Sequence, residues 1–245
     1  MEADGVEQSR QHKAIINRKG FLRAFYREIY GFFKEHAEPL GTSAIVELGS
    51  GGGFCPEVFP QVICTDLVIL PGVSVVCSAR NLPFGNESLS AILALNVFHH
   101  LNDCEAFLTE ASRCLQSGGK ILMVEPHNCL WSSLIYKNVH HEPFDEKQCD
   151  WKLPGQSDEG RLTIANGALP WIVFFRDRAR LDALFPNLRV DLYEPCFPFT
   201  YLLSGGLSAP SLLPAVAYPM VRAIEKLLLL DRHLGMFTKI VVTKR

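Results

Sequence analysis

Glycines at every second position of one short stretch leave bare backbone early in the chain. They stand at positions 49, 51 and 53 of ELGSGGG, which begins at Glu47 and follows an apolar run. Without a Cβ, such backbone can lie directly against a flat, nucleotide-like ligand. A dinucleotide site would need G-x-G-x-x-G, but Phe54 occupies the third small position, and no GKS or GKT signals a P-loop. The pattern therefore predicts a nucleoside cofactor other than a nicotinamide or a flavin.

An acid follows the next apolar run at a spacing that suits the same ligand. Asp66 ends QVICTD, which reads as a second buried strand. A carboxylate at the end of such a strand can accept hydrogen bonds from both hydroxyls of a ribose. A single acid there is more often a solvated turn residue. The order strand, glycine loop, strand and terminal acid favours the ribose contact.

Histidines follow two further apolar runs and supply candidates for proton transfer. His99 and His100 come after LSAILALNV, and His127 comes after KILMVEP. Imidazole changes its charge near neutral pH, so each could act as a general base. His141 lies in HHEPFDEK, where a His-His-acid cluster could bind a metal or act as a base, although a polar lid turn is the more common outcome. We predict His127, His99 and His141 as candidate bases, and no metal site, because no ligand set has convincing metal spacing.

Apolar strands that alternate with helical segments must position these residues. The expected strands are AIVEL, QVICTD, VSVVC, LSAILALNV, KILMVEP, LRVDLYEP and GMFTKIVVTK. Continuous apolar strands of this kind indicate a parallel sheet that is covered on both faces. We predict an α/β, Rossmann-like, seven-stranded and mostly parallel sheet with helices on both faces. The last strand is inserted antiparallel.

The remaining segments complete the predicted domain. A polar lead-in to about residue 16 precedes a helix from Arg18 to about His36, capped by Asn17, and a second long helix is expected from Pro170 to Phe185. We expect one domain over residues 1–245. Its parts are an N-terminal helical cover (1–40), a cofactor-binding core (43–126), an irregular lid (127–169) and an apolar cap insertion (195–234).

Composition limits the possible partners. The net charge is −2, and no concentrated basic face favours nucleic acid. The eight cysteines form no CxxC pair, which favours free thiols over disulfides or zinc. The N-terminus lacks the apolar stretch of a signal peptide, so we expect a cytoplasmic protein.

An uncharged segment near the C-terminal end carries weaker information about the ligand. Residues 195–221 are long enough to span a membrane, but five prolines and two glycines would break a spanning helix. We therefore expect no transmembrane segment. The segment suits an apolar cap that admits a lipid-like ligand, a dimer interface, or a peripheral membrane contact.

Taken in order, ELGSGGG, Asp66, ARNLPF, LNVFHHLND and CLQSGGKILMVEP resemble the class I S-adenosylmethionine-dependent methyltransferases, in particular the subgroup that acts on small molecules and lipids. The resemblance covers about residues 43–126. It implies S-adenosylmethionine as cofactor, S-adenosylhomocysteine as product, and a small-molecule, saccharide or lipid-like acceptor.

The resemblance also implies roles for single residues. Glu47, Gly49, Ser50, Gly51 and Gly53 would line the methionine end of the cofactor. Asp66 would hold the ribose, Leu67 would pack on the adenine, Ser78, Ala79 and Arg80 would border the adenine amine, and Asn96 would face the cofactor. Ser78 departs from the family pattern, which has an acid there, and a hydroxyl accepts a hydrogen bond more weakly.

Two alternatives remain open from the sequence. One is a non-catalytic module with the methyltransferase fold that binds the cofactor or a protein partner. The other is a nucleic-acid methyltransferase, which the acidic balance and the sequence NVFH, in place of an NPPY-like motif, oppose.

Overall fold

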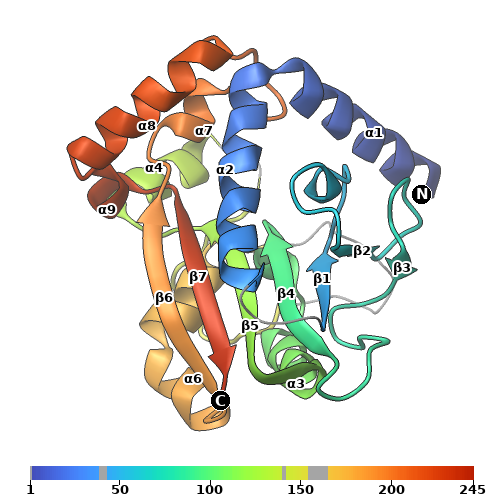
Figure 1. Ribbon diagram of the computed structural model, residues 1–245. Coiled ribbons are helices and arrows are strands. Elements are labelled where there is room, and N and C mark those ends of the chain that lie inside the picture. The colour runs from blue at the N-terminus through green and yellow to red at the C-terminus, as the bar shows by residue number, and fades with distance from the viewer. Residues whose placement is uncertain (1, 39–42, 140–141, 154–164) are drawn as a thin grey trace.

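The computed structural model describes the whole chain except residues 1, 39–42, 140–141 and 154–164. Seven strands form one sheet in the order β3-β2-β1-β4-β5-β7-β6. Strands β1 to β5 run parallel, and β7 pairs antiparallel with both β5 and β6 (Figure 1). The predicted α/β sheet, with its last strand inserted antiparallel, is confirmed.

The strands are short on one side of the sheet and long on the other. Their bounds are β1 Ala44–Leu48, β2 Ile63–Asp66, β3 Val75–Val76, β4 Leu89–Leu95, β5 Leu115–Pro126, β6 Leu188–Cys196 and β7 Phe237–Lys244.

Helices surround the sheet, with α2 in front of it and α3 behind it in Figure 1. The α-helices are α1 Glu2–Arg18, α2 Gly20–Ala37, α3 Cys104–Cys114, α4 Leu130–Asn138, α5 Leu169–Trp171, α6 Arg178–Leu184, α7 Thr200–Leu203, α8 Tyr218–Leu227 and α9 Leu230–Leu234. Short helical turns are η2 Cys55–Glu57, η3 Phe98–His100, η4 Ile172–Arg176 and η5 Ala215–Ala217.

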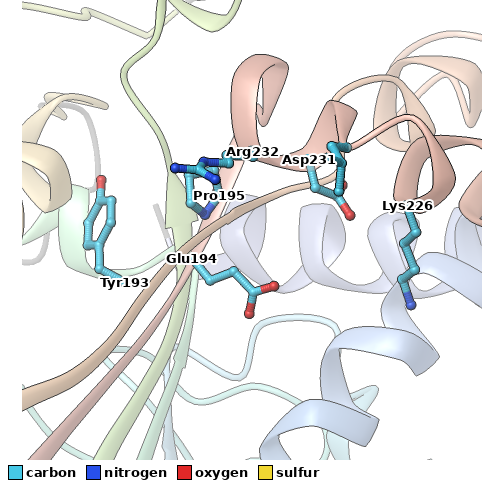
Figure 2. A pocket seen from close by; sticks show the side chains of 7 residues that line it. Tyr193, Glu194, Pro195, Lys226, Asp231 and Arg232 are labelled. Atoms are coloured by element: carbon cyan, nitrogen blue, oxygen red, sulfur yellow. The ribbon is translucent and has the colours of Figure 1, made fainter.

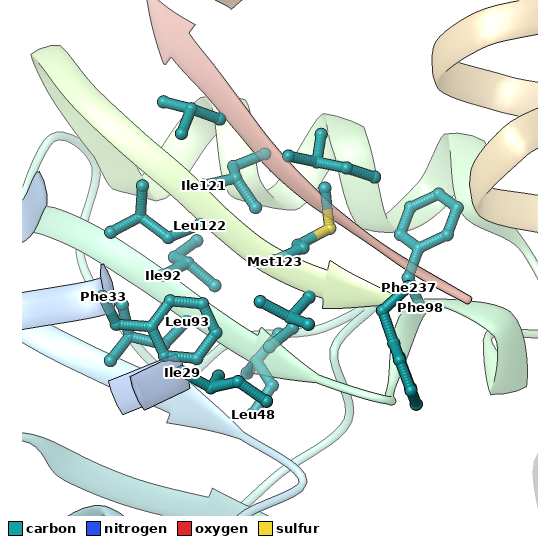
Figure 3. Close-up of a cluster of buried hydrophobic side chains, with 14 of the residues drawn as sticks. Ile29, Phe33, Leu48, Ile92, Leu93, Phe98, Ile121, Leu122, Met123 and Phe237 are labelled. Carbon is teal, nitrogen blue, oxygen red and sulfur yellow. The ribbon is translucent and has the colours of Figure 1, made fainter. Parts of the chain in front are cut away.

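The core forms where α2 meets the central strands. Ile29 and Phe33 of α2 are fully buried with Ile92 and Leu93 of β4 (Figure 3). Strand β4 is buried over six of its seven residues, because helices cover both of its faces. This burial fixes the carboxyl ends of β1, β2, β4 and β5 at one edge, where the candidate site residues lie.

The N-terminal segment differs from its prediction. Residues 2–18 form helix α1 rather than a polar lead-in, Asn17 lies inside that helix, and α2 begins at Gly20 after Lys19. The segment is rich in good helix formers. It also docks on the core, since the Ser9 hydroxyl donates to the Gly51 carbonyl (2.7 Å) and Ile16 is buried. These tertiary contacts stabilise helix α1, because its own apolar periodicity is weak.

Three further predictions need correction. The stretch after β5 is not wholly irregular, because α4 forms there with Cys129 and Ser132 in a reciprocal capping box. The helix expected from Pro170 to Phe185 is divided into α5, a π-helical turn and α6. In addition, β5 starts at Leu115, so the SGG stretch lies inside the strand instead of before it.

The predicted cap insertion lies between β6 and β7, at the end of the molecule toward which β1 and β4 point (Figure 1). It contains α7, η5, α8 and α9. Among the described residues, no helix is long and apolar enough to cross a membrane. All eight cysteines lie in the described part of the chain and are free thiols.

Candidate functional site

The glycine loop follows β1 in a conformation that only glycine adopts readily. Gly49, Gly51 and Gly53 have φ values of +60°, +48° and +64°, in the left-handed region. Gly49 is exposed, although the residues on both sides of it are buried. A Cβ at Gly49 would lie 2.7 Å from Cγ2 of Val97, so no side chain fits there. The loop therefore presents bare backbone at the rim of the sheet.

Asp66 lies directly across from this loop. Its Oδ2 accepts a hydrogen bond from the Gly51 amide (3.0 Å) and its Oδ1 accepts one from the Leu67 amide (2.7 Å). A carboxylate has about four lone-pair sites, so two donors leave capacity for two more. Leu67, next in the chain, is 41% exposed and offers an apolar surface beside the acid.

Asn96 directly follows β4 beside the loop and is held in an unusual conformation. Its φ is +54°, and its amide donates to the Val124 carbonyl of β5 (3.0 Å). Its side-chain Oδ1 is buried and has no hydrogen-bond partner. A buried polar atom of this kind is costly unless a ligand or water supplies a donor.

Glu47 turns inward, toward helix α2. Its Oε1 accepts a 2.5 Å hydrogen bond from the Tyr30 hydroxyl, and the Cys64 thiol lies 3.8 Å from Oε2. Burial raises the pKa of Glu47 and outweighs the opposing effect of these hydrogen bonds. The carboxyl group thus anchors α2 under the glycine loop.

Two other predicted contacts form local turns. The Ser50 amide donates to the Thr65 carbonyl (2.9 Å), which ties the glycine loop to β2. The Ser78 hydroxyl accepts from the Arg80 amide (3.3 Å), and Ser78 pairs with Asn81 across the same turn. Ala79 is half-buried in that turn.

Helix α1 covers the glycine loop from outside (Figure 1). Besides the bond from Ser9 to Gly51, the Lys13 backbone nitrogen lies 3.3 Å from where a Gly52 Cβ would be. The first part of the predicted 1–40 segment therefore touches the residues that the cofactor would contact.

A buried ionic network stands at the next strand end. The Glu125 carboxylate accepts from the amides of Val97 (2.7 Å) and Phe98 (2.8 Å) and from His99 Nδ1 (2.6 Å). The other ring nitrogen of His99 lies 3.3 Å from Glu142. Burial alone would lower the pKa of His99, but the bonds to Glu125 and Glu142 outweigh it and raise this pKa to about 9. His99 is therefore an imidazolium at neutral pH.

Among the described residues, three side chains of this network could offer ligands to one metal ion: those of His99, His100 and Glu142. Their ligating atoms lie within 4.8 Å of one another. His100 Nε2 lies 3.6 Å from Glu142, and the two imidazole rings are 4.2 Å apart. Because the protonated His99 has a carboxylate at each nitrogen, we interpret the group as an ion-pair network that joins β5, η3 and the segment after α4.

His127 lies just beyond β5 in a different environment. Its Nδ1 is 2.9 Å from the Tyr193 hydroxyl, and burial lowers its pKa to about 4. It is therefore neutral at pH 7. His141, the third candidate base, lies outside the described residues.

These residues fit an adenosyl cofactor. The rim at Gly49 is open backbone, Asp66 retains capacity for two donors, and the buried Oδ1 of Asn96 lacks one. These three features meet at the carboxyl ends of β1, β2 and β4, the edge at which open parallel sheets bind ligands.

Comparison with known proteins agrees with this geometry. Residues 46–123 match the family model described as a methyltransferase domain. The probable tRNA methyltransferase 9B of Bos taurus is 28% identical over 138 residues, which cover 49% of this chain and 29% of that protein. The ubiquinone biosynthesis O-methyltransferase of Rhizobium etli is 25% identical over 130 residues, or 46% of this chain and 52% of the relative.

A solved structure shares the fold. The crystal structure of the cyclase SpnF superimposes with a TM-score of 0.50 at 12% identity, over 89% of this chain and 81% of that one. The sheet order, the glycine loop and the matched segment are similar to those of the class I S-adenosylmethionine-dependent methyltransferases, the family that the sequence resembles. The chain spans about half or less of the length of the two curated relatives.

Sequence reasoning missed several residues that build the site. Glu125 and Tyr193 each hold a predicted residue in place, and Ser9 reaches the glycine loop from 42 residues away. Only Glu125 had a local signal, since it is an acid within an otherwise apolar strand.

Proposed function

We propose that the chain transfers the methyl group of S-adenosylmethionine to a small or lipid-like acceptor at the carboxyl edge of the sheet. The observation that carries this proposal is the buried, partnerless Oδ1 of Asn96 beside a glycine loop whose Gly49 is exposed backbone. The cofactor supplies an activated methyl group on a sulfonium, so the protein needs mainly to align the acceptor and exclude water.

The cofactor side of the site uses groups already described. Asp66 would accept hydrogen bonds from the ribose through its remaining lone pairs, and Leu67 would pack against the adenine. Ser78 and Arg80 would border the adenine amine, with Ser78 as a weaker acceptor than a carboxylate. Gly49, Ser50, Gly51 and Gly53 would follow the methionine end.

The acceptor side depends on protonation. His127 is neutral at pH 7 and can accept a proton, although with a pKa of about 4 it is a weak base. His99 is already protonated and cannot accept one, so we assign it to positioning η3 beside Glu125. A weak base at His127 and a protonated His99 suit an acceptor that is already a good nucleophile better than they suit an unactivated alcohol.

The acceptor class is supported by the cap. The segment from β6 to α8 is uncharged over residues 195–221 and lies at the carboxyl edge of the parallel strands (Figure 1). An apolar cover of this kind favours an isoprenoid, acyl or aromatic group on the acceptor. One curated relative is named for tRNA and the other for ubiquinone biosynthesis, and the net charge of −2 favours the second type of acceptor.

A non-catalytic module remains the second candidate. Its support is the packing of α1 on the glycine loop through Ser9 and Lys13, which could keep the loop closed. Such a protein would bind S-adenosylmethionine weakly, or bind it without turnover. Both candidates are tested by the same pair of measurements.

Calorimetry with S-adenosylhomocysteine tests cofactor binding. We expect binding, and we expect Asp66→Ala to weaken it by about 10- to 100-fold, because charge-assisted hydrogen bonds contribute about 1.5–3 kcal/mol. Asp182→Ala, on the exposed face of α6, is the matched control and should bind like the parent. Equal affinity of the Asp66→Ala protein and the parent would reject the ribose contact.

Turnover is tested with a panel of isoprenoid, acyl and saccharide acceptors, by following S-adenosylhomocysteine release. We expect release with at least one apolar acceptor, and a lower kcat in His127→Ala with unchanged cofactor affinity. Tight cofactor binding without release for every acceptor supports the non-catalytic module instead.

A further inference from the structure

We infer that the outer face of helix α8 is a docking surface for an anionic lipid bilayer. The inference goes beyond the proposed function, since an enzyme with any acceptor could carry such a surface. Vesicle binding can also be measured without cofactor.

The surface is an apolar stripe, which we define as Val216, Met220, Ile224, Leu227 and Leu228. The first four are spaced by four, four and three residues, so they follow one face of a helix. Val216 is 84% exposed, Leu227 is 82% exposed and Met220 is 60% exposed. Exposed large apolar side chains that form a continuous helical face mark an interaction site rather than scattered surface residues.

The acidic side chains of the same segment are turned toward the protein interior. Glu225 is buried and accepts hydrogen bonds from the amides of Phe199 and Thr200, and Asp231 accepts from the Phe197 amide. Both acids also bind the buried Arg222. The acids of α8 and α9 therefore point inward.

Two cations of the segment lie on the outside. Lys226 and Arg232 are exposed, whereas Arg222 is buried, and the ion pair from Lys226 to Glu28 is long (3.8 Å). Both line a surface pocket together with Leu229, which is 62% exposed (Figure 2). The exposed Glu194 also lines that pocket. Apolar side chains flanked by lysine and arginine are the pattern of helices that lie in the interface of anionic membranes.

The position of the stripe fits delivery of a lipid-like ligand. Helix α8 lies at the end of the molecule toward which β1 and β4 point, the same end as the glycine loop (Figure 1). Helix α4, which is beside α9 in Figure 1, exposes Leu130 (95%) and Leu134 (58%). A bilayer bound here would lie next to the carboxyl edge of the sheet.

A second copy of the chain fits the stripe less well than a bilayer. An isologous contact would bring the Lys226 side chains of both copies to one apolar interface. No stripe residue is acidic and Glu225 is turned inside, so the stripe itself offers no carboxylate to these lysines, and the exposed Glu194 lies in the neighbouring pocket. Unpaired like charges oppose such an interface, whereas phospholipid headgroups would neutralise them.

The test is flotation of the full chain with two kinds of vesicle, in the absence of cofactor. One kind contains phosphatidylcholine alone, and the other also contains about 30–50% phosphatidylglycerol. We expect binding to the anionic vesicles that weakens as salt is raised. The double variant Met220→Glu/Leu227→Glu should lower the partition coefficient by about tenfold or more. Because both side chains are exposed, the variant should melt at the temperature of the parent.

Two further variants separate the sources of binding. Leu184→Glu, a half-exposed leucine on α6 at the opposite end of the sheet, is the matched control and should bind like the parent (Figure 1). Lys226→Glu should weaken binding to anionic vesicles and leave the cofactor affinity unchanged. Absence of vesicle binding by the parent overturns the inference. The inference is also overturned if the parent is a dimer in light scattering, Leu227→Glu converts it to a monomer, and the parent does not bind vesicles.

Discussion

The two sides of the candidate site are built in different ways. On the cofactor side, positive φ values at Gly49, Gly51 and Gly53 and one acid, Asp66, create the contact surface from backbone within 18 residues of chain. On the acceptor side, each polar group depends on a residue far away in sequence, as His127 does on Tyr193. Local geometry therefore shapes the proposed cofactor side, whereas long-range packing shapes the proposed acceptor side.

Glu125 joins the two sides, and its loss should have the largest effect. Its carboxylate holds the amides of Val97 and Phe98, and Val97 in turn packs against Gly49. Glu125→Ala leaves buried donors and the charged His99 without a partner, so we expect a loss of about 3–5 kcal/mol in the free energy of unfolding. Urea denaturation measures it. The exposed Glu38→Ala is the control, with a loss below about 1 kcal/mol, and a similar small loss for both variants would disprove the link.

Gly49→Ala tests the cofactor side alone. The left-handed φ of +60° and the 2.7 Å contact with Val97 should together cost about 2–4 kcal/mol and weaken cofactor binding. Gly31→Ala is the matched control, because a Cβ at Gly31 meets nothing within 4 Å on helix α2. It should be neutral or stabilise by up to about 1 kcal/mol. Unfolding and calorimetry distinguish the two variants, and equal behaviour would contradict the proposed strain.

The acceptor side should respond to pH through His99. Its pKa rises from 6.5 to about 9 on folding, so its stabilising contribution is complete below pH 6.5 and is lost as pH rises through about 9. The difference in unfolding free energy between the parent and His99→Asn should therefore shrink from pH 6 to pH 10. Denaturant titrations at several pH values measure this, and a constant difference would show that His99 is not charged in the folded protein.

The smallest effect is expected at the bond between His127 and Tyr193. Tyr193→Phe removes one 2.9 Å hydrogen bond and should cost about 0.5–1.5 kcal/mol. A double-mutant cycle with His127→Phe isolates the coupling between the two side chains. We expect a positive coupling energy, and a value of zero would indicate that the acceptor side does not depend on this contact.

The sequence predicted the sheet and the position of the glycine loop, both for a physical reason. Buried parallel strands need continuous apolar runs, and a ligand on bare backbone needs glycine, so both requirements act on neighbouring residues. Helix α1 was not predicted, because its stability depends on contacts such as Ser9 to Gly51. The helix expected to start at Pro170 is interrupted by a π-helical turn that no local pattern indicated.

By itself the sequence determined the class of fold, the position of the glycine loop and the acid opposite it, since each follows from residue type at short spacing. Only the tertiary structure decided the protonation of the histidines. His99 lies between two carboxylates and is charged, whereas His127 is buried beside a tyrosine and is neutral. The pKa of an imidazole depends on the groups that folding brings near it, and those groups come from distant parts of the chain.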